Sequence, residues 1–214
     1  LSGEIPSEIG DLTNLTSLSL SWNELTGEIP STVGDLVNLS SLQLRYNQLS
    51  GVIPTEIENL NSLSSLVLSD NMFSGELSIG NLTNLSWLDL DNNQFSGQIF
   101  NMIVNLTNLS YLSLNGNQFS GEIPSEIGQL IDLQGFSVGG NQFTGEIPIE
   151  IGNLINLSNL WLGNNEFNGE IPTTIGNLVN LVSLGLCNNQ FTGQIPSEII
   201  NLINLEFFWL YNNQ

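Results

Sequence analysis

Leucine recurs along the chain at a fixed interval, with polar residues between the apolar ones. The residues that open each Leu-x-x-Leu run are Leu12, Leu36, Leu60, Leu82, Leu106, Leu130, Leu154, Leu178 and Leu202. Seven of the intervals are 24 residues long and one is 22, so eight units of 24 and one of 22 account for all 214 residues. Such a period is typical of repeat architectures, in which each unit buries its apolar face only against its neighbours.

Each unit contains a Leu-x-Leu step, such as Leu42-Gln43-Leu44, with the period of two expected of a strand with one buried face. A strand this short is unstable alone, so we expect the copies to pair in parallel about 4.8 Å apart. A Gly-x-Ile-Pro stretch then turns the chain, because glycine permits positive φ and proline fixes φ near −65°. We predict a solenoid with a parallel β-sheet on its concave face, loops and short 3₁₀ turns on its convex side, and little α-helix.

The complete unit pattern is carried by Leu39–Pro54, which reads Leu-Ser-Ser-Leu-Gln-Leu-Arg-Tyr-Asn-Gln-Leu-Ser-Gly-Val-Ile-Pro. It resembles the plant-specific class of leucine-rich repeats, found in polygalacturonase-inhibiting proteins, receptor-kinase ectodomains and bacterial and protist surface proteins. The resemblance covers the whole chain. It implies a single leucine-rich repeat solenoid domain over residues 1–214, built from nine repeats of about 24 residues, but no particular ligand, since this scaffold serves many.

Neither end of the repeat array carries a polar cap. The chain starts with Leu1-Ser2-Gly3 and stops at Asn213-Gln214, in the same phase of the repeat. Solenoids need capped ends, because each repeat buries its faces only on its neighbours. We therefore expect a segment of a longer array, or copies that stack head to tail into a filament.

The chain has one cation, Arg45, against 21 acidic residues, which gives a net charge of −20. Phosphate groups are bound by cations, so nucleic acid and anionic membranes are poor partners. There is no histidine and only one cysteine, which excludes a Ser-His-Asp triad and a zinc cluster. We predict a protein that is not an enzyme and that needs no cofactor, with calcium as the one metal worth considering.

One asparagine column runs through all nine units: Asn23, Asn47, Asn71, Asn93, Asn117, Asn141, Asn165, Asn189 and Asn213. An inward amide offers two donors and one acceptor to backbone groups that are left unpaired where a strand bends into its loop. We predict a structural asparagine ladder.

The residue types at the outward strand positions vary from unit to unit, and we predict that these residues bind the ligand. These positions hold every tryptophan and tyrosine of the chain: Trp22, Tyr46, Trp87, Tyr111, Trp161, Trp209 and Tyr211. Large aromatic side chains on a solvated sheet suggest ligand contacts, although such rings also pack against one another. Trp161 and Trp209 flank Gly185, which predicts a slot between two rings that suits a sugar or a flat side chain.

Acidic residues form two further groups. Asp70, Asp89 and Asp91 lie on neighbouring predicted strands, where they form a solvated acidic patch or a calcium site. Glutamates also recur in the loops after the glycine and after the proline, and like charges so close repel unless salt or divalent cations screen them. These columns favour a saline or calcium-rich setting, outside the cell or at its surface.

The sequence therefore favours a non-catalytic extracellular recognition or adhesion scaffold that binds a glycan or a protein on an aromatic concave face. One alternative is a structural protein that polymerises through its uncapped ends. The third is an ice-binding protein, because a hydroxyl residue precedes the loop glycine in eight units: Ser2, Thr26, Ser50, Ser74, Ser96, Ser120, Thr144 and Thr192.

Overall fold

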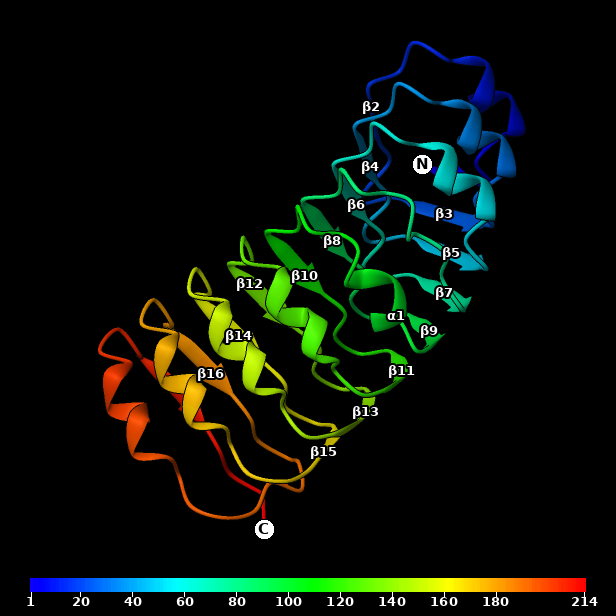
Figure 1. Cartoon of the computed structure of the whole chain (residues 1–214). Coiled ribbons are helices and arrows are strands. Elements are labelled where there is room, and N and C mark those ends of the chain that lie inside the picture. The colour runs from blue at the N-terminus through cyan, green and yellow to red at the C-terminus, as the bar shows by residue number, and fades with distance from the viewer.

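The computed structural model describes residues 1–214 as a curved stack of coils, one coil for each sequence unit (Figure 1). One parallel sheet has nine strands, one from each unit, and they follow one another in chain order. Its strands are β2 (Ser17–Ser19), β4 (Ser41–Gln43), β6 (Ser65–Val67), β8 (Trp87–Asp89), β10 (Tyr111–Ser113), β12 (Gly135–Ser137), β14 (Asn159–Trp161), β16 (Ser183–Gly185) and β17 (Phe207–Trp209). The solvent-facing side of this sheet is called the concave face below.

A second parallel sheet, which the sequence did not predict, runs beside the first along the stack (Figure 1). It contains β1 (Ser2–Gly3), β3 (Glu24–Gly27), β5 (Gln48–Gly51), β7 (Met72–Gly75), β9 (Gln94–Gly97), β11 (Gln118–Gly121), β13 (Gln142–Gly145) and β15 (Glu166–Phe167). These strands come from the Asn-x-Phe/Leu-x-Gly part of the unit. Seven of the eight strands end at a glycine with positive φ, such as Gly27 at 79°, which turns the chain away from the sheet.

Short 3₁₀ helices follow the proline of seven units: η1 (Ser7–Asp11), η2 (Ser31–Asp35), η3 (Thr55–Asn59), η4 (Ser125–Gln129), η5 (Ile149–Asn153), η6 (Thr173–Asn177) and η7 (Ser197–Asn201). Phe100 replaces the proline of the fifth unit, and there the chain forms the only α-helix, α1 (Phe100–Ile103). The fourth unit is two residues shorter, the proline being one of the two missing residues, and it forms no helix. The prediction of 3₁₀ turns and little α-helix is confirmed, and no helix is long enough to cross a membrane.

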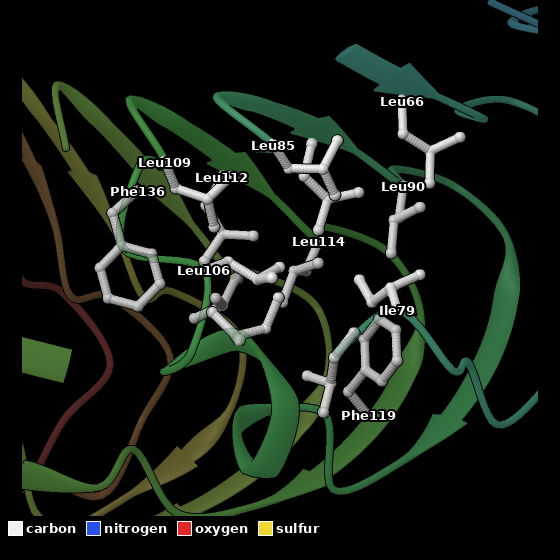
Figure 2. Close-up of a cluster of buried hydrophobic side chains, with 14 of the residues drawn as sticks. Leu66, Ile79, Leu85, Leu90, Leu106, Leu109, Leu112, Leu114, Phe119 and Phe136 are labelled. Atoms are coloured by element: carbon white, nitrogen blue, oxygen red, sulfur yellow. The ribbon is translucent and has the colours of Figure 1, made fainter. Parts of the chain in front are cut away.

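The space between the two sheets and the 3₁₀ helices holds one continuous cluster of buried apolar side chains. Leucines from several units converge there with Phe119 and Phe136 (Figure 2). Phenylalanines replace leucine at one position of the later units and stack in a column, with ring centroids of Phe95 and Phe119 6.1 Å apart. Because every unit contributes to the same core, each coil is stabilised by the coils on both sides.

The asparagine ladder lies where the first sheet bends toward the second. Asn117 is typical: its Nδ2 donates to the carbonyl oxygens of Leu90 (2.9 Å) and Leu114 (3.2 Å), and its Oδ1 accepts from the Phe95 amide at 3.0 Å. Each such amide therefore joins its own coil to the preceding one and satisfies backbone groups that the sheets leave unpaired. The structural role of the whole column stays a prediction, and the contacts of Asn117 support it.

Candidate functional site

Residues at the same position of successive units lie side by side on the concave face, because adjacent strands pair at equivalent positions. Trp87, for example, is the register partner of Ser65 on one side and of Tyr111 on the other. Outward side chains in successive units are therefore close enough to contact one another.

Two pairs of the predicted aromatic residues stack on this face. The Trp22 and Tyr46 rings have centroids 3.8 Å apart, and the Trp87 and Tyr111 rings have centroids 4.0 Å apart at an interplanar angle of 12°. Stacking leaves much of the ring surface in solvent, since Trp22 is 70% exposed and Trp87 is 42% exposed. The rings therefore support each other and still present apolar faces to a ligand.

Trp22 and Tyr46 also adopt a backbone conformation that bulky residues rarely take. Their φ angles are 60° and 54°, in the left-handed region, at a position that later units fill with Gly116, Gly140 or Asn164. Glycine and asparagine enter this region readily, whereas an aromatic residue there is strained. Such strain concentrates at functional sites, so these two rings stand where stability alone favours another residue.

Arg45 continues the Trp22–Tyr46 stack toward the middle of the sheet. Its guanidinium carbon lies 4.7 Å from the centroid of the Tyr46 ring, and its Nε donates to Asp70 Oδ2 at 3.3 Å. Asn92 Nδ2 donates to the other oxygen of Asp70 at 2.8 Å. The single cation of the chain is thus held by an aromatic ring and a carboxylate.

A groove of about 490 Å³ crosses the first four units of the concave face. Trp22 and Arg45 line it toward one edge of the sheet, Trp87 and Asp89 line it toward the other, and small or polar side chains such as Ser65 line the space between them. A groove over four strands spaced about 4.8 Å apart suits about four or five residues of an extended peptide.

Asp70, Asp89 and Asp91 do not converge on a common point. Asp89 Oδ2 accepts from the Ser69 hydroxyl at 2.9 Å, and Asp91 Oδ1 accepts from the Ser113 hydroxyl and from the Asn115 amide, both at 2.7 Å. No three acidic or cysteine side chains are placed to hold a metal ion. The geometry therefore gives no support to the predicted calcium site, because protein donors already engage each carboxylate.

Asp89 differs from an ordinary solvated carboxylate. Burial raises the pKa of Asp89, and the negative charge of Asp91 raises it further, against hydrogen bonds from the Asp91 amide and the Ser69 hydroxyl. Burial likewise raises the pKa of the Tyr111 hydroxyl on the next strand. The middle of the sheet thus holds a desolvated carboxylate directly beside an exposed tryptophan.

Trp161 contradicts the predicted slot over Gly185. A Cβ atom at Gly185 would lie 1.9 Å from the Trp161 ring, and one at Gly139 would lie 2.2 Å from its Nε1. The ring therefore lies flat over these glycines and fills the space itself, with its centroid 5.4 Å from that of Trp209. No sugar or flat side chain can enter between the two tryptophans in this arrangement.

The remaining predicted residues lie at the C-terminal end of the sheet. Trp209 stacks on Phe207 with ring centroids 5.5 Å apart, and Tyr211 is 57% exposed just beyond β17. Their outward position is as predicted. They lie apart from the groove lined by Trp22 and Trp87.

Sequence reasoning missed the glycines that seat aromatic rings. Tyr111 leans over Gly135, where a Cβ atom would lie 2.7 Å from the ring, just as Trp161 covers Gly185. The available signal was a glycine at an outward position of the strand that follows an aromatic residue. It also missed the burial of Asp89, because the residues at the equivalent position of the other units do not indicate its contact with Ser69.

Two models of leucine-rich repeats match the chain, one over residues 79–210 and one over residues 13–73. The chain belongs to the leucine-rich repeat family. No curated protein matches it.

Solved structures of leucine-rich repeat proteins superpose closely on the chain. A plant peptide hormone receptor, RGFR1 in complex with RGF2, is 38% identical with a TM-score of 0.97 over 100% of this chain and 35% of the receptor chain. The Arabidopsis receptor kinase HAESA, in complex with the peptide hormone IDA and the co-receptor SERK1, is 41% identical with a TM-score of 0.95 over 99% of this chain and 36% of that one. The chain therefore spans about a third of these receptor chains.

A plant ice-binding protein has the same repeat fold. It is 28% identical to the chain, with a TM-score of 0.87, and the match covers 100% of this chain and 69% of that protein. One leucine-rich repeat scaffold thus carries peptide receptors and an ice-binding protein, so the fold alone does not decide between these functions.

Proposed function

We propose that the chain is a non-catalytic recognition module that binds an extended peptide segment of a protein partner along the first five units of its concave face, outside the cell or at its surface. The observation that carries this proposal is the pair of exposed tryptophan rings, Trp22 and Trp87, on either side of a groove of about 490 Å³, each stacked on a half-buried tyrosine. Aromatic side chains with free faces around a polar floor are typical of binding hot spots. The similarity to receptor ectodomains in complex with peptide hormones supports the same conclusion.

The backbone of Trp22 and Tyr46 adds a second line of support. Both residues occupy the left-handed region at a position that aspartate fills in the third unit and asparagine or glycine fills in the later units. Folding gains little from this choice, because residues without strain are tolerated there in the later units. Recognition of a ligand gives these aromatic residues a reason to be present.

Selection from a phage-displayed library of random 12-residue peptides tests the proposal. We expect selected peptides to bind the wild-type chain, and Trp87→Ala and Tyr46→Ala each to weaken their affinity at least tenfold with little change in melting temperature. Ile155→Ala is the matched control, since Ile155 is an apolar residue 54% exposed outside this sheet. Peptides that bind the tryptophan and tyrosine variants as well as the wild type would contradict the assignment, and so would a library that yields no binder.

A glycan ligand and head-to-tail association are further proposals. Glycan binding now rests on the exposed rings of Trp22 and Trp87, since the slot between Trp161 and Trp209 is filled. In the first sheet β2 pairs only with β4, and β17 pairs only with β16. Molar mass measured by light scattering over a range of concentrations tests association: growth with concentration supports it, and a constant monomer mass contradicts it.

A further inference from the structure

Trp87 and Asp89 project from the same side of β8 into the groove. Residues two apart on a strand share a face at about 6.5 to 7 Å, so one side chain can contact both. Tyr111 covers one face of the Trp87 ring at 4.0 Å. On the other side the register partner of Trp87 is Ser65, whose side chain is small. The uncovered face of the indole therefore opens over the groove.

The Asp89 carboxylate keeps hydrogen-bonding capacity for a ligand. Its Oδ2 accepts from Ser69 at 2.9 Å and its Oδ1 accepts from the Asp91 amide at 3.2 Å. Each carboxylate oxygen can accept a further hydrogen bond. Asp89 is only 8% exposed, so a cation beside it interacts in a partly desolvated site, where the attraction is stronger than in bulk water.

The charges around the groove favour a positive ligand group. Arg45 forms its ion pair with Asp70 at 3.3 Å and acts on Asp89 only through its charge at longer range, so neither Asp89 nor Asp91 has a cationic partner in contact. The whole chain carries a net charge of −20, which attracts cationic partners at long range. A ligand carboxylate at this point would instead face several carboxylates of the protein.

We propose that the open face of Trp87 and the carboxylate of Asp89 form a subsite for an arginine or lysine side chain of the bound peptide. This inference rests on the proposed function. The ligand cation lies over the indole, where the negative face of the ring attracts it, and its N–H groups donate to Asp89. The planar guanidinium of arginine fits better than the ammonium of lysine, because it stacks on the indole and donates two parallel hydrogen bonds at the same time.

The subsite has a direct consequence for pH dependence. In the free protein, burial and the charge of Asp91 raise the pKa of Asp89, while Arg45 acts in the opposite direction. The other ionisable group that interacts with Asp89 is Tyr111 on β10. A bound cation favours ionised Asp89, so cation binding releases protons and strengthens as the pH rises through the raised pKa.

The experiment uses the whole chain, labelled with ¹⁵N, and two small probes. N-acetyl-arginine amide is titrated into the protein and compared with N-acetyl-citrulline amide, which has a similar shape and no charge. We expect saturable shifts of the Trp87 indole N–H and of the Ser65 and Asp89 amides with the arginine probe, and at least tenfold weaker binding of the citrulline probe. Binding of the arginine probe should also strengthen from pH 4 to pH 7.

Two variants separate the subsite from general charge attraction. Asp89→Asn keeps the shape, and its amide oxygen can accept from the Asp91 amide while its NH2 donates to the Ser69 hydroxyl oxygen. It should therefore fold normally, weaken arginine-probe binding at least tenfold and remove the pH dependence. Glu206→Gln removes one charge from an exposed residue beside β17, five units away, and should leave binding unchanged. Equal binding of the two probes, equal binding by Asp89→Asn, or equal loss in both variants would overturn the subsite.

The outcome is independent of the test for peptide binding. Selected peptides that need Trp87 but show no preference for arginine or lysine and no dependence on Asp89 would remove the subsite and leave the proposed function intact. An arginine probe that binds as described, together with a library that yields no peptide, would support the subsite and contradict the proposed binding of peptides.

Discussion

The two halves of the concave face use aromatic residues in different ways. Near the N-terminus, Trp22 and Trp87 stand in stacked pairs with exposed faces beside a groove. Near the C-terminus, Trp161 lies flat on a floor of glycines and closes the space around it. An outward aromatic residue is therefore available to a ligand where the next strand carries a side chain, as for Trp87 beside Tyr111. It is part of the packing where the next strand carries glycine, as for Trp161 and also for Tyr111, which lies over Gly135.

Adding a side chain under Trp161 should give the largest difference in unfolding free energy between the two halves. Gly185→Val should lower the free energy of unfolding by about 3 kcal/mol, because the new side chain meets the Trp161 ring and overpacks the face. Ser19→Val, at the equivalent position of the first unit, should change it by less than about 0.5 kcal/mol because Ser19 is exposed. Urea denaturation followed by circular dichroism measures both, and equal effects would show that the two halves are packed alike.

Removing the tryptophan side chains should give a smaller difference in unfolding free energy between the two halves. Trp161→Ala should destabilise the chain by about 2 kcal/mol, less than a fully buried tryptophan, because one face of the ring packs on the glycine floor. Trp87→Ala should have an effect below about 1 kcal/mol, close to the value of one aromatic pair. Urea titrations of both variants check this, and a larger loss for Trp87→Ala would reverse the assignment of the two halves.

Much of this architecture was predictable from the sequence, because it depends on columns that repeat in every unit. The strands, the asparagine ladder and the phenylalanine column each follow from one residue type at a constant phase. The packing of Trp161 and the burial of Asp89 were not predictable in the same way. They depend on the side-chain volume and the hydrogen-bond donors of the neighbouring strand. The second sheet was missed because its strands carry no Leu-x-Leu step. A strand such as β9 offers one buried apolar residue, Phe95, and ends at a glycine, whereas most of the equally short strands of the first sheet are marked by two core-facing leucines.

A pH-dependent effect should separate Asp89 from the other carboxylates. Because its pKa is raised in the folded chain, ionising Asp89 opposes folding, and its contribution to stability is lost as the pH rises from about 4 through that raised value. Asp89→Asn should therefore gain stability relative to the wild type between pH 4 and pH 7. Unfolding free energies of both proteins at the two pH values measure the difference, and a relative loss for the variant would contradict the sign.

The smallest expected effect concerns the strained backbone of the N-terminal half. Trp22→Asn should change the free energy of unfolding by less than about 0.5 kcal/mol, because relief of a left-handed conformation offsets the loss of the stack with Tyr46. The same variant should bind selected peptides more weakly. Thermal and urea unfolding provide the stability values, and a loss above about 2 kcal/mol would mean that Trp22 serves the fold.

NMR mapping of a selected peptide on the ¹⁵N-labelled chain decides whether the first five units hold the binding surface. If they do, we expect shifts in β2, β4, β6, β8 and β10, together with shifts of the indole signals of Trp22 and Trp87. The Trp161 indole should shift little, because its ring is already packed on glycine. Shifts confined to β14, β16 and β17, or to the 3₁₀ helices, would contradict peptide binding on the first five units.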